Sequence, residues 1–507
     1  MTELHRLLID DFYVAESRGL TRSFHPMKKH AASPVVSPEK PWELRTGGEG
    51  VASPAVIWDP DEKLYKMWYW AVVGGLHDCY ATSHDGIHWE KPSLGIKAFE
   101  GSTDNNIVET PGRLGPGSIM FMPDAPLGPE SRYTMVSWIP SPTIHQRYMP
   151  LFSADGLRWR TLKDADDEPG ISGPGVGDTG TCCLASDRFP REPDQPGVFL
   201  AFPRAHCKVG RFGRRAVGFT YCDAVPNFNK LMADWPLPVL VMAPDLIDDE
   251  MARERLARAY KQGITHYDEP ADHHCEFYSM QVWRCGDVFL GSVWIFDISM
   301  NTDRLGAWNQ HGIMETQLAY SRDCVHWERL GDRQPWIERG EPGSVDDAMI
   351  HFNCAPVRVG DELFVYYSAG NMPHPTVDPS WTAGISREVL AGRRHARQHI
   401  GLATCRPDGF ISLDAGRSVG RLRTKPFEWR GQSLFLNLDA TGGEAAVRLL
   451  DENGRTIKGA DQPTVLTGNH LEGEVKLDGL DPASLNGRKC CLEIRMKAAK
   501  LYSYTIR

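Results

Sequence analysis

A repeated hairpin is the feature that most restricts how this 507-residue chain can fold. Three segments share a short apolar strand, a Ser-x-Asp turn and a second strand that ends on tryptophan: Tyr80–Pro92, Leu151–Leu162 and Ala319–Leu330. The first two turns contain Asp-Gly, which favours a tight hairpin because glycine adopts positive φ without steric cost. Such self-similarity indicates a repeat architecture.

A second kind of hairpin, two strands joined by a polar turn, accompanies the first kind. Radial repetition of four-stranded antiparallel sheets is typical of a β-propeller, so these hairpins predict five blades. A β-sandwich with a similar number of strands is the structural alternative. The second hairpins are Pro54–Trp70, Gly117–Trp138, Thr181–Arg204, Tyr278–Phe296 and Asn353–Gly370, and degenerate partners of the third and fifth lie at Val217–Phe228 and Ile400–Leu413.

The pattern changes after Gly416, where short strands follow closely and Asn453-Gly454 predicts a hairpin turn. This spacing is typical of a β-sandwich of the jelly-roll kind. We therefore expect an all-β chain, with a five-bladed β-propeller at residues 1–415 and an accessory β-sandwich at residues 416–507. One insertion, Asp245–Gly263, has acidic residues in its first turn and a closing glycine, which predicts a surface helix.

Composition excludes several classes of protein. A net charge of −10 argues against a nucleic-acid partner. No segment reaches the ~18 apolar residues of a membrane helix, and Asp10 and Asp11 lie where a signal peptide would be apolar. We therefore expect a cytoplasmic protein without a membrane partner. The 12 cysteines are scattered, which predicts reduced, buried thiols instead of a disulfide framework.

Several carboxylates precede the first strand of a predicted blade. In a propeller the innermost strands line a central tunnel, so the loops that enter them converge at one mouth. Asp178, Glu276 and Asp346 stand in glycine-rich or apolar surroundings and are the catalytic candidates. Chance placement of some of the 66 acidic residues in surface loops is the alternative, and it weighs more for the others: Glu43, Glu49, Asp104, Glu109 and Asp347.

The segment Ala271–Tyr278 places two histidines, a cysteine and a glutamate in consecutive positions. Side chains that are neighbours on a strand point to opposite faces, so these four cannot all reach one metal ion. We therefore predict neither a metal site nor a cofactor. Glu276 and His274 share a face, while His273 and Cys275 point away. His274 is then a candidate hydrogen-bond donor to substrate, with a structural histidine as the alternative.

Other polar and aromatic residues lie near the predicted mouth of the tunnel. Aromatic faces stack on sugars, and basic side chains bind hydroxyl or carboxylate groups. Each of these residues could instead have a surface or packing role. The candidates for substrate binding are His25, Trp42, Glu43, Arg204, His206, His274 and His374.

The blade hairpins and their spaced acids resemble five-bladed propeller glycosidases of glycoside hydrolase families 32, 43 and 68 and their bacterial relatives. The resemblance covers residues 5–415 and rests on the Ser-x-Asp-Gly-x-x-Trp turns, Gly177–Gly180, Cys275–Tyr278 and Ser344–Ile350. It implies that Glu276 is the acid and that Asp178 and Asp346 are the two aspartates, one a nucleophile or base and one an orienting group. The Trp-Met-Asn-Asp-Pro-Asn-Gly segment of those families is replaced here by the Glu43 and Glu49 region, which leaves the retaining or inverting outcome open.

These observations predict a glycoside hydrolase that removes terminal units from plant or algal oligosaccharides, furanosides among them. Two or three carboxylates around one pocket suit this reaction, because one protonates the leaving oxygen and another attacks or activates water. A glycoside phosphorylase and a non-catalytic carbohydrate-binding propeller are the alternatives. An oligosaccharide is the expected partner in each case.

Overall fold

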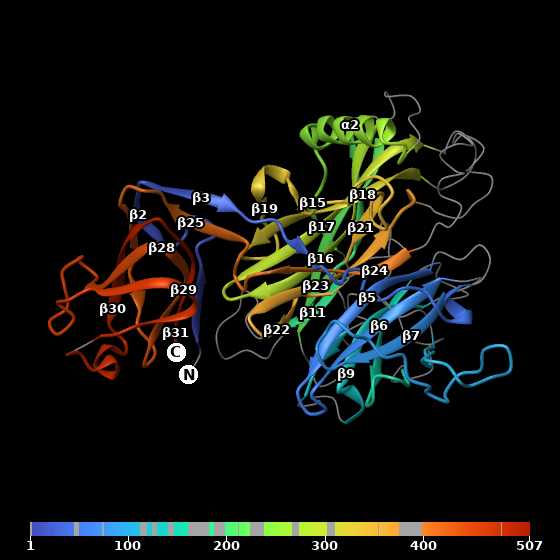
Figure 1. The fold of residues 1–507 in the computed structure, drawn as a ribbon, viewed down its shortest axis with the longest axis horizontal. Helices are drawn as coiled ribbons and strands as arrows, with labels where there is room; N and C mark the ends of the chain where they lie inside the picture. Colours follow the sequence, from blue (N-terminus) through green and yellow to red (C-terminus); the bar gives the residue numbers. More distant parts are fainter. Residues whose placement is uncertain are drawn as a thin grey trace.

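The computed structural model describes residues 3–44, 50–72, 76–111, 119–123, 129–139, 147–160, 182–186, 198–210, 212–223, 238–265, 273–301, 310–352, 354–374, 398–477 and 479–507. Within these ranges the chain is almost entirely β-structure, with one α-helix, α2 (Leu246–Lys261). The predicted all-β fold class is confirmed: a five-bladed β-propeller is followed by a C-terminal jelly-roll-like β-sandwich (Figure 1).

Five antiparallel groups of strands, the blades, follow one another along the chain, and each begins with its innermost strand. Single parallel pairs join blades four, five and one into one continuous sheet. Blade one contains β5 (Gly50–Asp59), β6 (Leu64–Val72) and β7 (Leu76–Ser83). Blade two contains β8 (Met120–Phe121), β9 (Tyr133–Ile139) and β10 (Arg147–Ser153), and blade three β11 (Cys182–Ser186), β12 (Val198–Phe202), β13 (Arg204–Val209), β14 (Phe212–Asp223) and β15 (Val239–Met242). Blade four contains β16 (His274–Cys285), β17 (Val288–Asn301), β18 (Gln310–Ser321), β19 (Trp327–Arg329) and β20 (Pro335–Ile337), and blade five β21 (Met349–His351), β22 (Val357–Val359), β23 (Glu362–Gly370) and β24 (Gln398–Cys405).

The ring of blades is closed by a strand from the N-terminal part of the chain. β4 (Lys28–Lys29) pairs antiparallel with β24 and adds an outer strand to blade five. A single parallel pair, Gln398 with Gly50, joins β24 to β5 of blade one. Because β4 precedes blade one in the sequence but completes blade five, backbone hydrogen bonds hold the two ends of the propeller together.

The repeated turns form as predicted and connect neighbouring blades. In blade two the Ser153 hydroxyl accepts the Gly156 N–H at 2.9 Å, and the Trp159 indole donates to the Gly156 carbonyl at 2.9 Å. Trp68 of blade one donates to the same carbonyl at 2.6 Å. In blade one the Gly86 carbonyl likewise accepts the Tyr366 hydroxyl of blade five at 2.7 Å. Each of these two turns therefore docks on an aromatic residue of the adjacent blade.

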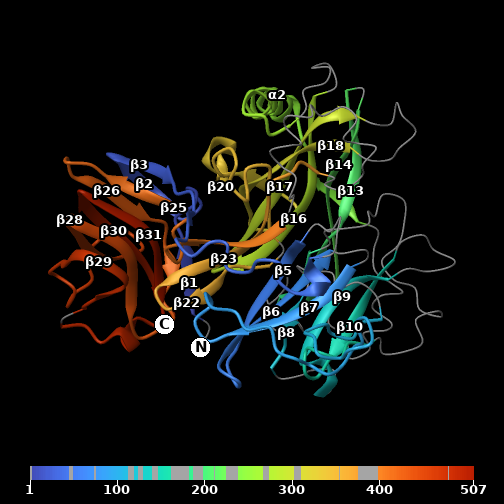
Figure 2. The same ribbon diagram turned by 45° about the vertical axis from the view of Figure 1, so that its right-hand side comes forward.

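The sandwich combines strands from both ends of the chain. β1 (Leu4–Leu7) pairs with β31, β2 (Val14–Arg18) with β26, and β3 (Leu20–Phe24) with β25. In Figures 1 and 2 the blue β2 and β3 lie beside orange and red strands of the sandwich. The predicted domain boundary between residues 415 and 416 stays a prediction. β1–β3 and β25 lie in the range assigned to the propeller, but they pair within the sandwich. The sandwich strands are β25 (Ile411–Ala415), β26 (Gly420–Thr424), β27 (Phe427–Glu428), β28 (Leu434–Asp451), β29 (Thr464–Val475), β30 (Lys489–Lys497) and β31 (Ala499–Ile506).

Helix α2 lies where the sequence predicts a surface helix. The Asp245 carboxylate accepts the backbone N–H of Ile247 and Asp248, and the Asp248 carboxylate accepts the N–H of Asp245. This reciprocal capping box fixes the start of the helix. α2 contacts β16 and β17 of blade four and lies across the long strands of that blade in Figure 1.

Two further expectations from the sequence concern the cysteines and the membrane. Each cysteine whose side chain is described is a free thiol. In the part of the chain that the structure describes, no helix is long and apolar enough to cross a membrane.

The docking of Trp68 on Gly156 gives a test of the contact between blades one and two. Gly156 has φ +76°, and a Cβ added there would lie 2.7 Å from Cζ2 of Trp68. Gly95 has φ +68°, but a Cβ there would have no heavy atom within 4 Å. We expect Gly156→Ala to be less stable than Gly95→Ala by about 1–3 kcal/mol, because both variants share the φ penalty and only the first overpacks. Urea unfolding of the two variants measures this difference, and equal midpoints would contradict the tight contact.

Candidate functional site

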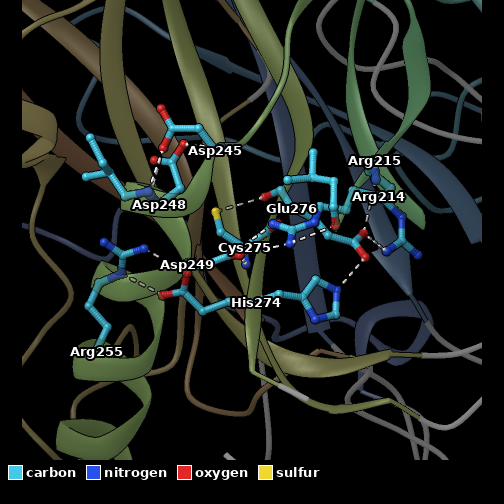
Figure 3. A network of polar contacts seen from close by, with 12 residues as sticks. Arg214, Arg215, Asp245, Asp248, Asp249, Arg255, His274, Cys275 and Glu276 are labelled. Atoms are coloured by element: carbon cyan, nitrogen blue, oxygen red, sulfur yellow. Dashed lines mark hydrogen bonds and ion pairs between the residues drawn. The ribbon is translucent and has the colours of Figure 1, made fainter. Parts of the chain in front are cut away.

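Glu276 lies on β16, at the start of the innermost strand of blade four, and its carboxylate is held from two sides (Figure 3). Oε2 is 2.5 Å from Nη1 of Arg215 on β14, and Oε1 is 3.1 Å from Nε2 of His274. The His274 ring stacks on Phe212 with centroids 4.2 Å apart. Only 1% of Glu276 is exposed. The expected shared face of His274 and Glu276 is confirmed by their contact.

The neighbours of Glu276 determine its charge. Burial alone would raise the pKa of this carboxyl, but the hydrogen bond with His274 and the positive charge of Arg215 outweigh it. Together they lower the pKa of Glu276 to about 2. Glu276 is therefore ionised near neutral pH, and an ionised carboxylate accepts a proton or stabilises positive charge instead of donating a proton. The acid role implied by the resemblance stays a prediction, and it requires that the contacts with His274 and Arg215 be weakened.

The opposite face of the same strands carries a structural ion pair. Arg214 makes a bidentate pair with Asp249 of α2, at 2.5 Å and 2.8 Å, and Asp249 also accepts the N–H of Cys275 at 3.0 Å. Figure 3 shows how this network joins β14, β16 and α2. Burial raises the pKa of the Cys275 thiol well above its usual value. The thiol is therefore protonated and unsuited to act as a nucleophile or metal ligand.

Tyr278, two residues after Glu276, occupies a β-bulge and is half-exposed. The Arg204 guanidinium lies 4.3 Å from its ring centroid, and Nε of Arg204 donates to the Tyr278 carbonyl at 3.2 Å. The Tyr278 hydroxyl is 3.3 Å from Nε2 of His374. Trp294 lies parallel to the tyrosine ring, with centroids 6.2 Å apart, and Phe296 contacts it edge-on. Bulges commonly re-aim side chains beside functional sites.

The structure thus brings together four of the residues that the sequence singles out. Glu276 and His274 contact each other. Arg204 and His374 contact Tyr278, which lies on the same strand as Glu276. Arg215 connects the two groups, because its guanidinium pairs with Glu276 and also lies 5.1 Å from the Tyr278 ring centroid. Arg215 and Tyr278 complete the site, although sequence reasoning did not assign them a role.

Asp346 has a different set of neighbours. Its Oδ2 is 2.6 Å from Nζ of Lys29 on β4 and accepts the Tyr367 hydroxyl at 2.9 Å. Its Oδ1 accepts the Ser344 hydroxyl at 3.0 Å. These contacts tie the closing strand to blade five, which is sufficient to explain a buried aspartate at this position. A catalytic role for Asp346 stays a prediction.

The remaining candidates are dispersed. Glu43 is buried and accepts the Tyr69 hydroxyl at 2.7 Å and a Lys91 ion pair at 2.9 Å, while the Trp42 indole donates to Asn106 at 2.8 Å. These contacts anchor the segment before blade one. His25 is 2.7 Å from the Ser412 hydroxyl of the sandwich, and His206 is exposed on β13. Asp178 and Glu49 lie outside the described residues.

Among the residues that the structure describes, no group of three or more histidine, cysteine or acidic side chains is arranged to hold a metal ion.

No protein-family model matches the sequence, and no curated protein matches it. Among the solved structures that match with low identity are the following three. A glycosyl hydrolase from Bacteroides ovatus is 12% identical over 76% of this chain and 95% of its own, with a TM-score of 0.44. The second is a structure from the GH130 family of mannoside phosphorylases, described as containing glycoside hydrolases for β-1,2-mannosidic linkages in Candida mannan. It is 13% identical over 76% of this chain and 95% of its own, with a TM-score of 0.43. The third is an N-acetylgalactosamine deacetylase from F. plautii, bound to blood group B trisaccharide. It is 16% identical over 78% of this chain and 97% of its own, with a TM-score of 0.43. With every TM-score below 0.5, these similarities carry no conclusion about the reaction of this chain.

The ion pair between Arg215 and Glu276 predicts a measurable change in titration. In Arg215→Met one of the two favourable partners is lost while His274 remains, so the pKa of Glu276 should rise from about 2 toward its usual range. NMR of protein labelled at the glutamate carboxyl carbon, with Glu276→Gln to assign the signal, measures this pKa. Arg421→Met, which removes a partner of Glu493 in the sandwich, is the control and should leave the Glu276 signal unchanged.

The stability of the two proteins should also differ with pH. In the unmodified protein the lowered pKa of Glu276 adds stability that is fully present above pH 4.5 and is lost as the pH falls toward 2. In Arg215→Met the pKa is lowered less, so less of this pH-dependent stability should remain, because the buried carboxyl keeps only its His274 partner. If Glu276 still titrates near pH 2 in Arg215→Met, Arg215 is not the group that keeps it ionised.

Proposed function

We propose that this protein is a carbohydrate-active enzyme, a glycoside hydrolase whose site is built around Glu276. The observation that carries the proposal is an ionised, buried carboxylate beside a half-exposed aromatic ring, at the start of an innermost propeller strand. Tyr278 can stack on a sugar face. Arg204, Arg215 and His374, which contact Tyr278, can donate hydrogen bonds to sugar hydroxyls.

The charge of Glu276 suits one half of the reaction. Cleavage of a glycosidic bond passes through a transition state with positive charge on the sugar ring. An ionised carboxylate can stabilise that charge, attack the anomeric carbon, or take a proton from the water whose hydroxide adds there. A second carboxyl must then donate the proton that the leaving oxygen takes. We include Asp178 and Asp346 in the proposal as candidates for this acid, on the strength of the sequence resemblance.

We extend the proposal to removal of terminal sugars from plant or algal oligosaccharides, furanosides among them. The support is the resemblance of the blade motifs to propeller glycosidases of families 32, 43 and 68.

A non-catalytic carbohydrate-binding propeller is the second candidate function. The observation that favours it is the state of Glu276, since both carboxylate oxygens are hydrogen-bonded within the protein. Such a carboxylate could serve only to position Arg215 and His274 for binding.

Replacement of Glu276 tests the hydrolase proposal. Glu276→Gln keeps the shape of the side chain and removes its charge, so we expect kcat/KM to fall by at least about 100-fold while sugar binding persists. The assay measures sugar released from a panel of plant and algal oligosaccharides, with and without phosphate. Glu493→Gln is the matched control, because Glu493 is also buried and pairs with two arginines, Arg421 and Arg495, but lies in the sandwich.

The outcomes separate the candidate functions. Full activity in Glu276→Gln would refute the catalytic role of Glu276. Binding without release of sugar by the unmodified protein would favour the non-catalytic propeller. Turnover that depends on phosphate would identify a phosphorylase.

A further inference from the structure

The contacts around His351 do not explain why a histidine occupies this position. It lies on β21, the innermost strand of blade five, and is half-exposed. Its Nδ1 is buried and has no hydrogen-bond partner among the described residues. A buried polar atom without a partner costs folding free energy, and in a native structure it calls for an explanation.

The ring of His351 belongs to the aromatic wall of the proposed site. Its centroid lies 4.5 Å from that of Trp294, the residue that stacks on Tyr278. The Trp294 indole donates to the Phe352 carbonyl, next to His351, at 3.0 Å. Tyr278, Trp294 and His351 therefore form one continuous wall that runs from blade four to blade five. Tyr278 and His351 are its half-exposed members. Trp294 is buried and contacts both of them.

Blade one meets this wall at the same place. His351 pairs with Ser368 of β23, and the Ser368 hydroxyl accepts the N–H of Ser53 on β5 at 2.7 Å. Ser53 has φ +56° and lies in an irregularity of the innermost strand of blade one. Irregular inner strands thus occur in blade one at Ser53 and in blade four at Tyr278. Bulges and strained residues of this kind gather at functional sites.

The chemistry of His351 fits a sugar hydroxyl. Burial lowers the pKa of His351 to about 4, so the imidazole is neutral near pH 7. A neutral imidazole carries one donor and one acceptor nitrogen, so His351 can hydrogen-bond a hydroxyl group as either donor or acceptor. A residue needed only to pack against Trp294 would require neither nitrogen.

We propose that His351 is a specificity-determining residue of this site and hydrogen-bonds a hydroxyl of a sugar that lies against Tyr278. The binding site then spans the joint between blades four and five and recognises an uncharged part of the oligosaccharide at His351. This inference rests on the proposed function only in taking a carbohydrate as the ligand.

The test uses the full-length protein in a Glu276→Gln background, so that binding is measured without turnover. The probe is a partial acid hydrolysate of plant cell-wall polysaccharides, and isothermal titration calorimetry measures its binding. His351→Phe preserves a ring against Trp294 and removes both nitrogens. We expect thermal stability to be retained and binding to weaken about three- to tenfold. His30→Phe is the control, because His30 also lies near an aromatic ring, Phe364, at 6.0 Å between centroids, but adjoins the outer strand β4.

Binding by His351→Phe that equals that of its Glu276→Gln parent, or a parent that does not bind the hydrolysate at all, would overturn the inference. Should His351→Phe fail to fold, His351→Ala provides the same test, because it removes both nitrogens without adding bulk. A failure of the proposed hydrolysis can be told apart from a failure of the role proposed for His351. If the unmodified protein cleaves nothing in the hydrolysate but His351→Phe weakens binding, hydrolysis is wrong and the role of His351 stands.

Discussion

The placement of two consecutive arginines, Arg214 and Arg215, is the constraint on which the proposed site depends. Strand alternation sends their side chains to opposite faces of β14, so one guanidinium meets Asp249 of α2 and the other meets Glu276 of β16. A buried carboxylate without such a partner would take up a proton. Through Arg215, blade three therefore helps to keep the carboxylate in blade four ionised, and Arg214 holds α2 against the propeller. The site is consequently a property of the joint between blades more than of any single blade.

Carboxylates placed before the innermost strands have two different uses in this fold. Glu276 pairs with Arg215, which also lies against Tyr278, whereas Glu43 and Asp346 bind Lys91 and Lys29 and fasten the N-terminal segments to the propeller. Those segments must be fastened, because β4 closes blade five from the opposite end of the chain. A position before an innermost strand therefore does not by itself indicate catalysis. What distinguishes Glu276 is its ion pair with Arg215, a half-exposed side chain that also lies against the half-exposed Tyr278 ring.

The parts of the structure that could be predicted from sequence are those determined by local chemistry. The Ser-x-Asp turns reveal the blades because the residue after the aspartate adopts positive φ, which glycine favours, as Gly86 and Gly156 show. Asp245 caps α2 through amides two and three residues away. Alternation along one strand was enough to place His274 beside Glu276. Arg215, Trp294 and His351 could not be found in this way, because they reach the site from other strands. Nor does any local signal indicate that β1, β2 and β3 pair with a sandwich that begins hundreds of residues later.

A crystal structure of Glu276→Gln soaked with mixed plant oligosaccharides would show whether a sugar binds against Tyr278 with its scissile bond beside residue 276. We expect a sugar ring stacked on Tyr278, with the glycosidic oxygen or a water at the anomeric carbon within about 2.6–3.2 Å of residue 276. The same structure would show a second carboxyl at ~5–5.5 Å for a retaining enzyme or ~6.5–9.5 Å for an inverting one. Sugar bound only elsewhere on the protein, with Arg215 and residue 276 still in contact and no ligand at Tyr278, would contradict the account.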